Sequence, residues 1–368
     1  MPHRAPETHR TRVVFVDLAR AVAVVLMVAG HTSSALLAPE YRAGPWFEVW
    51  TFQRGLTSAL FLLLSGFAFS LATTRHWPLH VRRSPAVFKR VRRFLLFVVL
   101  GYALHFPVLP ASALATATDA EWRSFLAVDV LQLIGVTLLA LQALVFILRS
   151  RRLFMVANFA IAVAVVAAAP ALWRGEGGAG APFALAAYLS PAAGSQFPVF
   201  PWAGYVFLGA GAGQLYARWG AAHLASYELW AMLVPGLVLL VGGFSLGGGT
   251  IASDVAIRTG ACLLVLALLA HASRSVMHLP HVFGAVAQES LVVYFVHLCV
   301  VYGSIWNPGL TRLYVAGLPL GATVVVALGV IAAMVALASQ WNRLKHVRPV
   351  AARRIALAVG VILVARLI

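Results

Sequence analysis

The chain has 368 residues, of which 61% are hydrophobic and only 11% are charged, and its mean hydropathy is +0.89. A soluble domain carries about 25% charged residues, so this composition excludes an ordinary soluble protein. It predicts an all-α polytopic membrane protein, because a helix satisfies its own backbone hydrogen bonds in lipid. The two cysteines, Cys262 and Cys299, both lie in apolar segments and indicate neither a disulfide framework nor a zinc site.

The formal net charge of +17 does not point to nucleic acid as a partner. The basic residues are spread over short loops between apolar segments. In a membrane protein such loops set the topology and meet anionic lipid head groups. Membrane lipids are therefore the expected partners of these charges.

Eleven segments are long and apolar enough to be candidate membrane spans, which are about 17–25 residues long. No segment between them has the length and polarity of a soluble domain. We therefore expect one domain, with a cytoplasmic tail over residues 1–12 and a helical bundle over residues 13–367. The predicted spans are 13–37, 55–74, 93–110, 126–148, 153–172, 198–217, 227–247, 254–272, 284–305, 316–338 and 351–367.

Basic residues concentrate in alternate loops, which gives the orientation. They cluster in segments 1–12, 75–93, 149–152 and 343–354, whereas the other loops carry few charges of mixed sign. The positive-inside rule then places the N-terminus in the cytoplasm and the C-terminus outside, in a multi-pass protein of the inner (plasma) membrane.

The first predicted span carries three polar residues that need an explanation. Arg20 and His31 are eleven positions apart, so they leave the same face of a helix, roughly 16 Å apart along its axis. Asp17 lies three positions before Arg20, within reach on that face. A charged side chain in lipid costs about 2.5–3.5 kcal/mol on insertion scales, so such residues usually face a bundle interior and mark a functional pathway. The alternative is that Asp17 and Arg20 merely pair near a helix end.

A basic cluster follows the second span. Arg90, Arg92 and Arg93 belong to it, and Arg90 and Arg93 are spaced to share one helix face. Arginine suits bidentate binding of phosphate, so a polyanionic ligand is one interpretation and contact with lipid phosphates is the other. Ser65, beside Gly66 near the end of the second span, is interpreted first as a site of close helix packing.

Two later spans also carry polar side chains at helical spacing. Asp129 and Gln132 are three apart at the start of the fourth span. Ser290, Tyr294 and His297 follow the i, i+4, i+7 pattern of one stripe in the ninth. Each such group needs a partner or a water-filled cavity. The glycine-rich run at 209–213 lies within a span with no strand before it, so it predicts a helix-packing seam rather than a nucleotide loop.

Together these elements resemble a known group. The Arg20-x10-His31 spacing is similar to the signature of the membrane acyltransferase type-three superfamily, and two further segments resemble its bacterial branch similar to heparan-α-glucosaminide N-acetyltransferase. In the lysosomal relative the proposed catalytic histidine lies further into the loop after the first span, where this chain has no histidine. The segments that carry the resemblance are Phe61-Leu-Leu-Leu-Ser-Gly-Phe67, Ser290-Leu-Val-Val-Tyr294-Phe-Val-His297, Asp129-Val-Leu-Gln-Leu-Ile-Gly135 and Phe200-Pro-Trp-Ala-Gly-Tyr-Val-Phe-Leu-Gly209.

The resemblance implies an enzyme that moves an acetyl group from cytoplasmic acetyl-CoA to a hydroxyl or amine of an extracytoplasmic or lipid-linked glycan. It implies His31 as general base and Arg20, oriented by Asp17, on the thioester carbonyl or the cofactor. A relay would make His31 or His297 an acyl-imidazole carrier. The cofactor set would be Arg90, Arg92, Arg93, Ser65, Asp129 and Gln132, with no metal. A homodimer is a further expectation, since related enzymes are often dimers.

Two other functions fit a many-span protein with buried polar groups. A proton-coupled transporter or flippase would use Arg, Asp and His along a substrate path. The sequence has no internal repeat and no obvious pair of broken helices in matching halves, which argues against it. A haem-binding electron-transfer bundle would use His31 and His297 as axial ligands.

Overall fold

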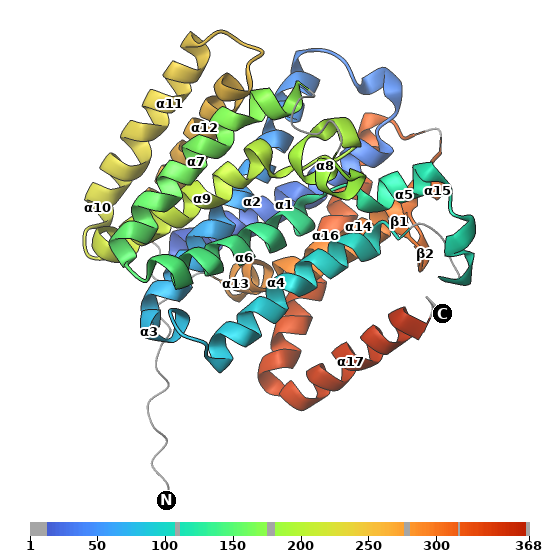
Figure 1. Ribbon diagram of the computed structural model, residues 1–368. Coiled ribbons are helices and arrows are strands. Elements are labelled where there is room, and N and C mark those ends of the chain that lie inside the picture. Colours follow the sequence, from blue (N-terminus) through green and yellow to red (C-terminus); the bar gives the residue numbers. More distant parts are fainter. Residues whose placement is uncertain (1–12, 107–110, 175–180, 276–279, 316, 366–368) are drawn as a thin grey trace, which may run out of the picture.

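The structure is a computed structural model that describes residues 13–106, 111–174, 181–275, 280–315 and 317–365. Its elements are almost all helices (Figure 1). The longer ones are α1 (Val14–Leu36), α2 (Pro45–Arg75), α4 (Pro85–Leu104), α6 (Val130–Leu148), α7 (Arg151–Trp173), α9 (Val199–Leu215), α11 (Val234–Ser245), α12 (Ile251–Ser273), α14 (Ser290–Tyr302), α16 (Leu320–Val347) and α17 (Pro349–Ala365). The shorter ones are α3 (Trp77–His80), α5 (Asp119–Leu126), α8 (Phe183–Leu189), α10 (Leu224–Tyr227), α13 (His281–Gln288), α15 (Leu310–Leu313), the 3-10 helices η1 (Pro39–Tyr41), η2 (Ala111–Thr116) and η3 (Pro191–Ala193), the π-helices η4 (Tyr216–Gly220) and η5 (Glu228–Leu233), and strands β1 (Gly303–Ser304) and β2 (Asn307–Pro308).

The helical content and the apolar helices confirm the prediction of an all-α polytopic membrane protein. Among the described residues, seven helices are long and apolar enough to cross a membrane, or eight if α13 and α14 count as one bent span. Helices also occupy the other three predicted segments. Of these, α9 and α17 have only 17 residues each, and α4 carries Lys89, Arg90, Arg92 and Arg93. The count of eleven spans therefore stays a prediction.

The ninth predicted span is not one continuous helix. It breaks at Glu289, and α13 and α14 meet at an angle of 74°. The Glu289 side chain is 3% exposed and pairs with Lys345 Nζ at 2.6 Å, and Asn342 Nδ2 donates to it at 2.9 Å. Both partners lie on α16, so the break puts a buried carboxylate where α16 neutralises it. The apolar run alone does not reveal this bend.

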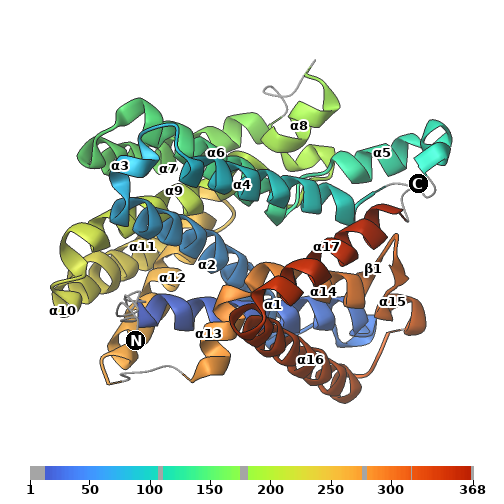
Figure 2. The same cartoon turned by 90° about the horizontal axis from the view of Figure 1, so that it is seen from below.

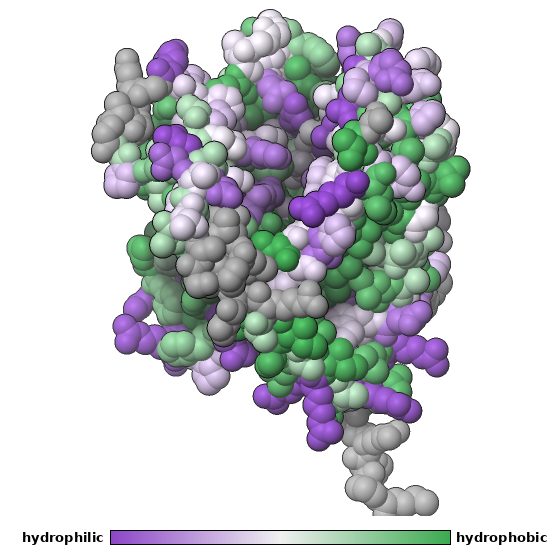
Figure 3. Space-filling view, turned by 90° about the vertical axis from the view of Figure 1, so that its right-hand side faces the viewer, coloured by the Kyte–Doolittle hydropathy of each residue, from purple (hydrophilic) through white to green (hydrophobic). Residues whose placement is uncertain are grey.

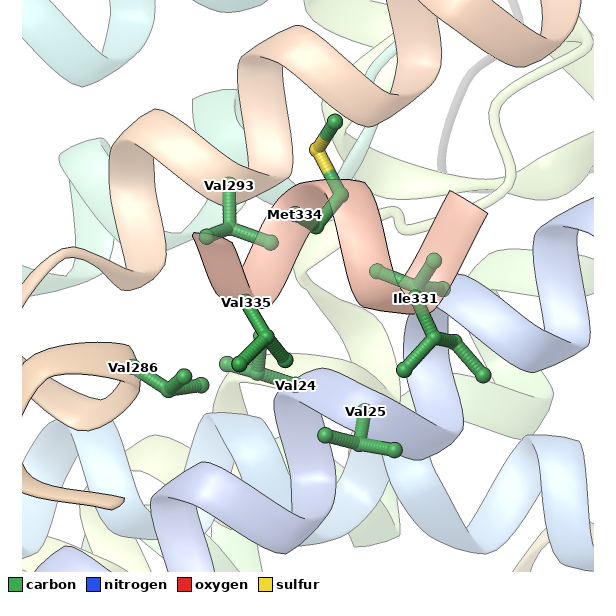
Figure 4. A pocket seen from close by; sticks show the side chains of 8 residues that line it. Val24, Val25, Val286, Val293, Ile331, Met334 and Val335 are labelled. Carbon is green, nitrogen blue, oxygen red and sulfur yellow. The ribbon is translucent and has the colours of Figure 1, made fainter. Parts of the chain in front are cut away.

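Helix α1 is the centre of the bundle, in contact with α2, α12, α13, α14 and α16. Figure 2 shows α1 with α2 on one side and α16 on the other. Where α1 meets α13, α14 and α16, the contact is made by apolar side chains with a gap of only about 10 Å³ (Figure 4). Val24, Val286, Val293 and Met334 are among them. This tight seam fixes α14 against α1, and both helices carry candidate functional residues.

Helices α2 and α9 approach each other through glycines. An added Cβ at Gly66 would collide with the Val206 carbonyl oxygen, and one at Gly209 would collide with the Leu63 carbonyl oxygen. Gly213 likewise faces the backbone of Phe67, 2.6 Å from an ideal Cβ to its oxygen. The prediction of a helix-packing seam at 209–213 is therefore confirmed, and Gly66 makes the close approach that the sequence suggested.

Charged and apolar surfaces separate on the molecule. In Figure 3, hydrophilic side chains gather in the upper half, around a recess, and again along the lower edge, with apolar side chains over much of the surface between them. Many large apolar side chains are exposed on the outer helices, for example Val163, Val238 and Val325. An apolar belt between two polar ends is the surface that a lipid bilayer requires.

Candidate functional site

A cavity of about 570 Å³ lies between α1, α2, α4, α6 and α14, with α3 at its rim. Its volume is within the usual range of small-molecule sites, about 300–1,000 Å³. The lining is mainly apolar and aromatic, with a polar minority that includes Arg20, Ser65, Arg90 and Arg93. Four residues that the sequence analysis singled out, from three different helices, therefore meet at one site.

The charge of this cavity is uniformly positive. Arg20, Lys89, Arg90 and Arg93 contribute side chains to it, and its lining contains no carboxylate among the described residues. Arg90 is held in place, because its Nη1 donates to Thr73 Oγ1 at 2.8 Å and its guanidinium lies 5.0 Å from the Phe69 ring centre. Fixed cations without competing carboxylates favour a polyanionic ligand.

Arg20 reaches the cavity from α1. Its charge is close enough to interact with both Asp17 and Arg93. Asp17 therefore offsets part of the repulsion between two arginines. The pairing expected from the spacing of Asp17 and Arg20 leaves the guanidinium facing the cavity rather than lipid.

His80 lies at the rim of the cavity, on α3 outside the predicted spans. Its side chain is 5% exposed, and its Nδ1 has no hydrogen-bond partner among the described residues. Burial, together with the charges of Arg90 and His76, lowers the pKa of His80 to about 4. The imidazole is therefore neutral at physiological pH and adds a polar group without adding charge.

A second cluster lies further along α1, around His31. The rings of His31 and His297 are 5.3 Å apart between centres in an edge-to-face arrangement. The Tyr302 hydroxyl lies 3.2 Å from His31 Nδ1 and 3.3 Å from the His31 carbonyl oxygen. Tyr302 is 45% exposed, so the cluster can be reached from outside the bundle.

The hydrogen bonds constrain the tautomers of both histidines. His297 Nδ1 lies 2.8 Å from the Val293 carbonyl oxygen, which only accepts, so Nδ1 carries the proton. The lone pair of His297 is then on Nε2, which is buried without a partner among the described residues. When Tyr302 donates to the His31 carbonyl, His31 Nδ1 donates to Tyr302, and His31 Nε2 is left with the lone pair. Both imidazoles thus keep a basic nitrogen.

Helix α14 connects the two clusters. Ser290 and Tyr294 line the cavity, and His297, one turn further on, faces His31. The Tyr294 ring lies 5.6 Å from that of His297, and Tyr294 is close enough to Asp129 for the two side chains to interact electrostatically. Asp129 therefore lies behind Tyr294 rather than in the cavity lining. The i, i+4, i+7 stripe forms one wall between the basic cavity and the histidine pair.

Two of the predicted residues lie elsewhere. Arg92 is exposed and does not line the cavity, because it is on a different face of α4 from Arg90 and Arg93. Gln132 is fully buried against Gly101 of α4, and neither atom of its amide group has a hydrogen-bond partner among the described residues. Among the described residues there is no group of three or more His, Cys, Asp or Glu that could hold a metal ion.

Three further residues at these clusters were not singled out from the sequence. Lys89 lies within the basic run but was not separated from its neighbours, and Tyr302 follows the ninth-span stripe by five residues. Arg54 comes from α2 and lies close enough to His31 for its charge to act on the imidazole. Only a prediction of how α2 packs on α1 would have brought Arg54 to this site.

The fold and the site define a class: a multi-pass membrane protein with a basic cavity beside its central helix α1 and a pair of histidines, one on α1 and one on α14. The comparison with protein families makes this specific. Residues 12–247 match the family described as "Heparan-alpha-glucosaminide N-acetyltransferase, catalytic". The match covers well over half of the chain, which therefore belongs to this family of membrane acetyltransferases. No curated protein sequence matches the chain.

The matched segment has a clear relation to the site. It runs from the start of α1 to the end of α11 and so includes Arg20, His31 and Arg90. It ends before α14, which supplies Ser290, Tyr294 and His297. The resemblance proposed from the sequence motifs is thereby confirmed at the level of the family.

Proposed function

We propose that the protein transfers an acetyl group from cytoplasmic acetyl-CoA to a hydroxyl or amine of an extracytoplasmic or lipid-linked glycan. Membership of an acetyltransferase family supports the reaction type. The observation that carries the proposal is that one helix, α14, lines both the basic cavity and the histidine pair. A donor bound at the cations would then point its reactive end along α14 toward His31.

The proposed orientation follows the distribution of charge. The helix ends near Arg75, Arg151, Arg348 and Arg354 lie on the side that we assign to the cytoplasm, since basic loops stay inside. Eleven spans with the N-terminus inside and the C-terminus outside, in the inner membrane, are consistent with this. The rim of the cavity at Lys89 and Arg90 would then open toward the cytoplasm, where acetyl-CoA is made available.

The cations would hold the phosphates of acetyl-CoA. Lys89, Arg90 and Arg93 supply positive charge at the rim, and guanidinium groups match phosphate geometry. The lining of the cavity is mainly apolar, so it suits the pantetheine arm better than the nucleotide. Ser65 and Ser290 offer hydroxyls to its amide groups.

Arg20 would position the arm rather than stabilise the reacting carbonyl. It lies eleven residues from His31 on the same helix, which is about 16 Å along the axis. One group cannot contact a thioester carbonyl at His31 over that distance. Arg20 also faces the cavity together with Arg93, which is consistent with a role in binding the donor.

His31 would act as the general base. Its Nε2 accepts the proton of the acceptor hydroxyl or amine as that oxygen or nitrogen forms a bond to the thioester carbonyl carbon. The tetrahedral intermediate then breaks its carbon–sulfur bond, and the imidazolium returns the proton to the sulfur, which yields CoA as the thiol. The charge of Arg54 acts on His31, so Arg54 would help to stabilise the negative charge that develops on the carbonyl oxygen. Direct transfer is proposed; a relay through an acyl-imidazole on His31 or His297 is the alternative.

The test uses the full-length protein in lipid nanodiscs with radiolabelled acetyl-CoA and glucosamine oligosaccharides. His31→Ala should lower kcat about 10²- to 10⁴-fold while acetyl-CoA still binds. His223→Ala, at an exposed histidine remote from both clusters, is the control. Wild-type turnover by His31→Ala protein would remove its assigned role. An acetylated enzyme trapped without acceptor would favour the relay, and absence of any transfer or hydrolysis would favour the transporter.

The donor site has its own test. Arg90→Gln and Arg93→Gln should each raise the Kd for acetyl-CoA about tenfold, since each removes a charge-assisted contact to phosphate. Arg152→Gln, an exposed arginine at the start of α7, should leave Kd unchanged. Equal behaviour of the three variants would instead support a purely topological role for the basic cluster on α4.

A further inference from the structure

A second pocket, of about 320 Å³, opens at the end of the bundle opposite the basic loops. It lies where the end of α7, the start of α9 and the start of α12 come together. Helix α7 begins at Arg151 on the basic side, so its last residue, Trp173, is at the other end. The pocket is therefore separate from the basic cavity and shares no lining residue with it.

The lining of this pocket combines aromatic rings with a carboxylate. Trp173, Trp202 and Tyr205 supply the rings, and Asp254 supplies the carboxylate from α12. The rings are fixed: Trp202 packs 5.8 Å from Tyr205 and 4.8 Å from Phe197, between ring centres. Trp173 Nε1 donates to the Phe200 carbonyl oxygen at 2.9 Å. Because these rings are already ordered, they lose little conformational entropy when a ligand binds.

One polar atom of a residue in the wall of the pocket is unsatisfied. Tyr205 is 2% exposed, and its hydroxyl has no hydrogen-bond partner among the described residues. A buried polar atom without a partner costs about 1–3 kcal/mol, which calls for an explanation. Tyr205 lines the pocket, so a ligand with hydroxyl groups would supply the missing hydrogen bond.

The charge balance selects the kind of ligand. An aromatic pocket with a free carboxylate would suit a cation. Here both carboxylate oxygens of Asp254 lie 2.8 Å from Nε of Arg258, so its charge is already compensated. The Asp254 side chain is still 55% exposed and can accept further hydrogen bonds. Flat aromatic faces, a compensated carboxylate and an unsatisfied hydroxyl together match a neutral sugar ring, which has apolar C–H faces and an edge of hydroxyls.

Arg258 links this pocket to the part of α2 that lies beside His31. The Arg258 guanidinium packs directly on the backbone of Gly55 in α2, where any side chain would collide with it. The neighbouring Arg54 extends along Gly30 of α1 and acts on His31. The Asp254–Arg258 pair therefore reaches α2 at the residue next to Arg54, the arginine that acts on His31.

We propose that the pocket bounded by Trp173, Trp202, Tyr205 and Asp254 is a carbohydrate subsite that holds a neutral sugar residue of the acceptor on the extracytoplasmic side. The assignment of this sugar to the acceptor on the extracytoplasmic side rests on the proposed function, in which the acceptor is a glycan that approaches His31 from outside. The recognition itself rests only on the pocket.

The test is direct binding of a neutral disaccharide, N,N′-diacetylchitobiose, to the full-length protein in nanodiscs without acetyl-CoA. Saturation-transfer NMR and titration should detect binding that weakens about tenfold in Trp202→Ala, which loses a stacking ring. Tyr205→Phe, which removes only the hydroxyl, should weaken it about threefold. Trp230→Ala, at a 63% exposed tryptophan on η5, is the matched control and should bind as the wild type does.

The outcomes separate this inference from the proposed function. The subsite would be overturned if the disaccharide does not bind, or if Trp202→Ala and Tyr205→Phe both bind it as tightly as the wild type does. This holds even if acetyl-CoA binds normally. Sugar binding that depends on Trp202 in a protein that fails to bind acetyl-CoA would support the subsite and refute the proposed donor. Choline binding in place of sugar would show a cation site and overturn the inference. If Trp202→Ala does not fold, Tyr205→Phe decides alone.

Discussion

Gly209→Ala should destabilise the protein although it adds a single methyl group. Helix α9 meets α2 backbone to backbone at this position, and the new Cβ would overlap the Leu63 carbonyl oxygen. A backbone atom in a helix cannot rotate away as a side chain can, so the two helices would have to separate. The same contact exists in reverse at Gly66, whose added Cβ would overlap the Val206 carbonyl oxygen.

The expected magnitude combines two opposing effects. Overpacking of a tight contact costs about 1–3 kcal/mol and sometimes more. Alanine in place of glycine within a helix contributes about 0.8–1 kcal/mol in the other direction. Because a backbone oxygen blocks the new methyl group at Gly209, we place the overpacking cost at or above the top of its range, and the net loss at about 2 kcal/mol.

The assay is the apparent melting temperature of detergent-purified protein, followed by a thiol-reactive dye at the buried Cys262. Gly329→Ala is the control, because an added Cβ on that residue of α16 meets nothing within 4 Å. It should be neutral or stabilising by about 0.4–1 kcal/mol. Gly209→Ala should also weaken acetyl-CoA binding, since α2 carries Ser65 and Phe69 into the cavity. A Gly209→Ala protein that melts at or above the wild-type temperature would refute the backbone-contact reasoning.

Three further predictions follow from single contacts. Lys345→Ala should lower the free energy of unfolding by about 1 kcal/mol, since it leaves the buried Glu289 unpaired and Lys345 itself is 42% exposed. Adding Glu289→Gln to this variant should restore part of that stability. If the two substitutions instead lower stability additively, the pairing is contradicted. Stability should fall as pH drops from about 6.5 toward 4, because the unfolded chain then protonates His80 while the folded chain does not. His80→Gln should therefore make the melting temperature fall less steeply over this pH range. A melting temperature that falls just as steeply in His80→Gln would argue against the lowered pKa of His80. Tyr302→Phe should lower kcat about tenfold without changing the KM for acetyl-CoA, because it removes the hydroxyl that orients His31; an unchanged kcat would show that this contact is dispensable.

Much of the fold was predictable from local sequence. In lipid a helix is the default for a long apolar run, because only a helix satisfies its backbone within the segment. The positions of α1, α6, α7 and α12 therefore follow closely from hydropathy. Helical geometry alone places Arg20 and His31 on the same face of one helix, which is why both were singled out as candidate functional residues.

Contacts between helices were a different matter, since they depend on packing over long sequence distances. The sequence grouped Arg92 with Arg90 and Arg93, but the rotation of α4 in the bundle leaves Arg92 outside the cavity. At the break near Glu289, α16 brings Lys345 to the buried carboxylate, a contact that hydropathy does not reveal.

Hydropathy and helical periodicity thus determined the class of protein, the approximate position of its helices and the polar residues that needed an explanation. Only the tertiary structure decided which of those residues meet. It brought Tyr302 and Arg54 to His31, and it assembled the aromatic pocket around Tyr205 from three separate helices. The physical reason is that helix formation in a membrane is a local event, whereas the rotation and register of each helix are set by side-chain packing and glycine contacts with its neighbours.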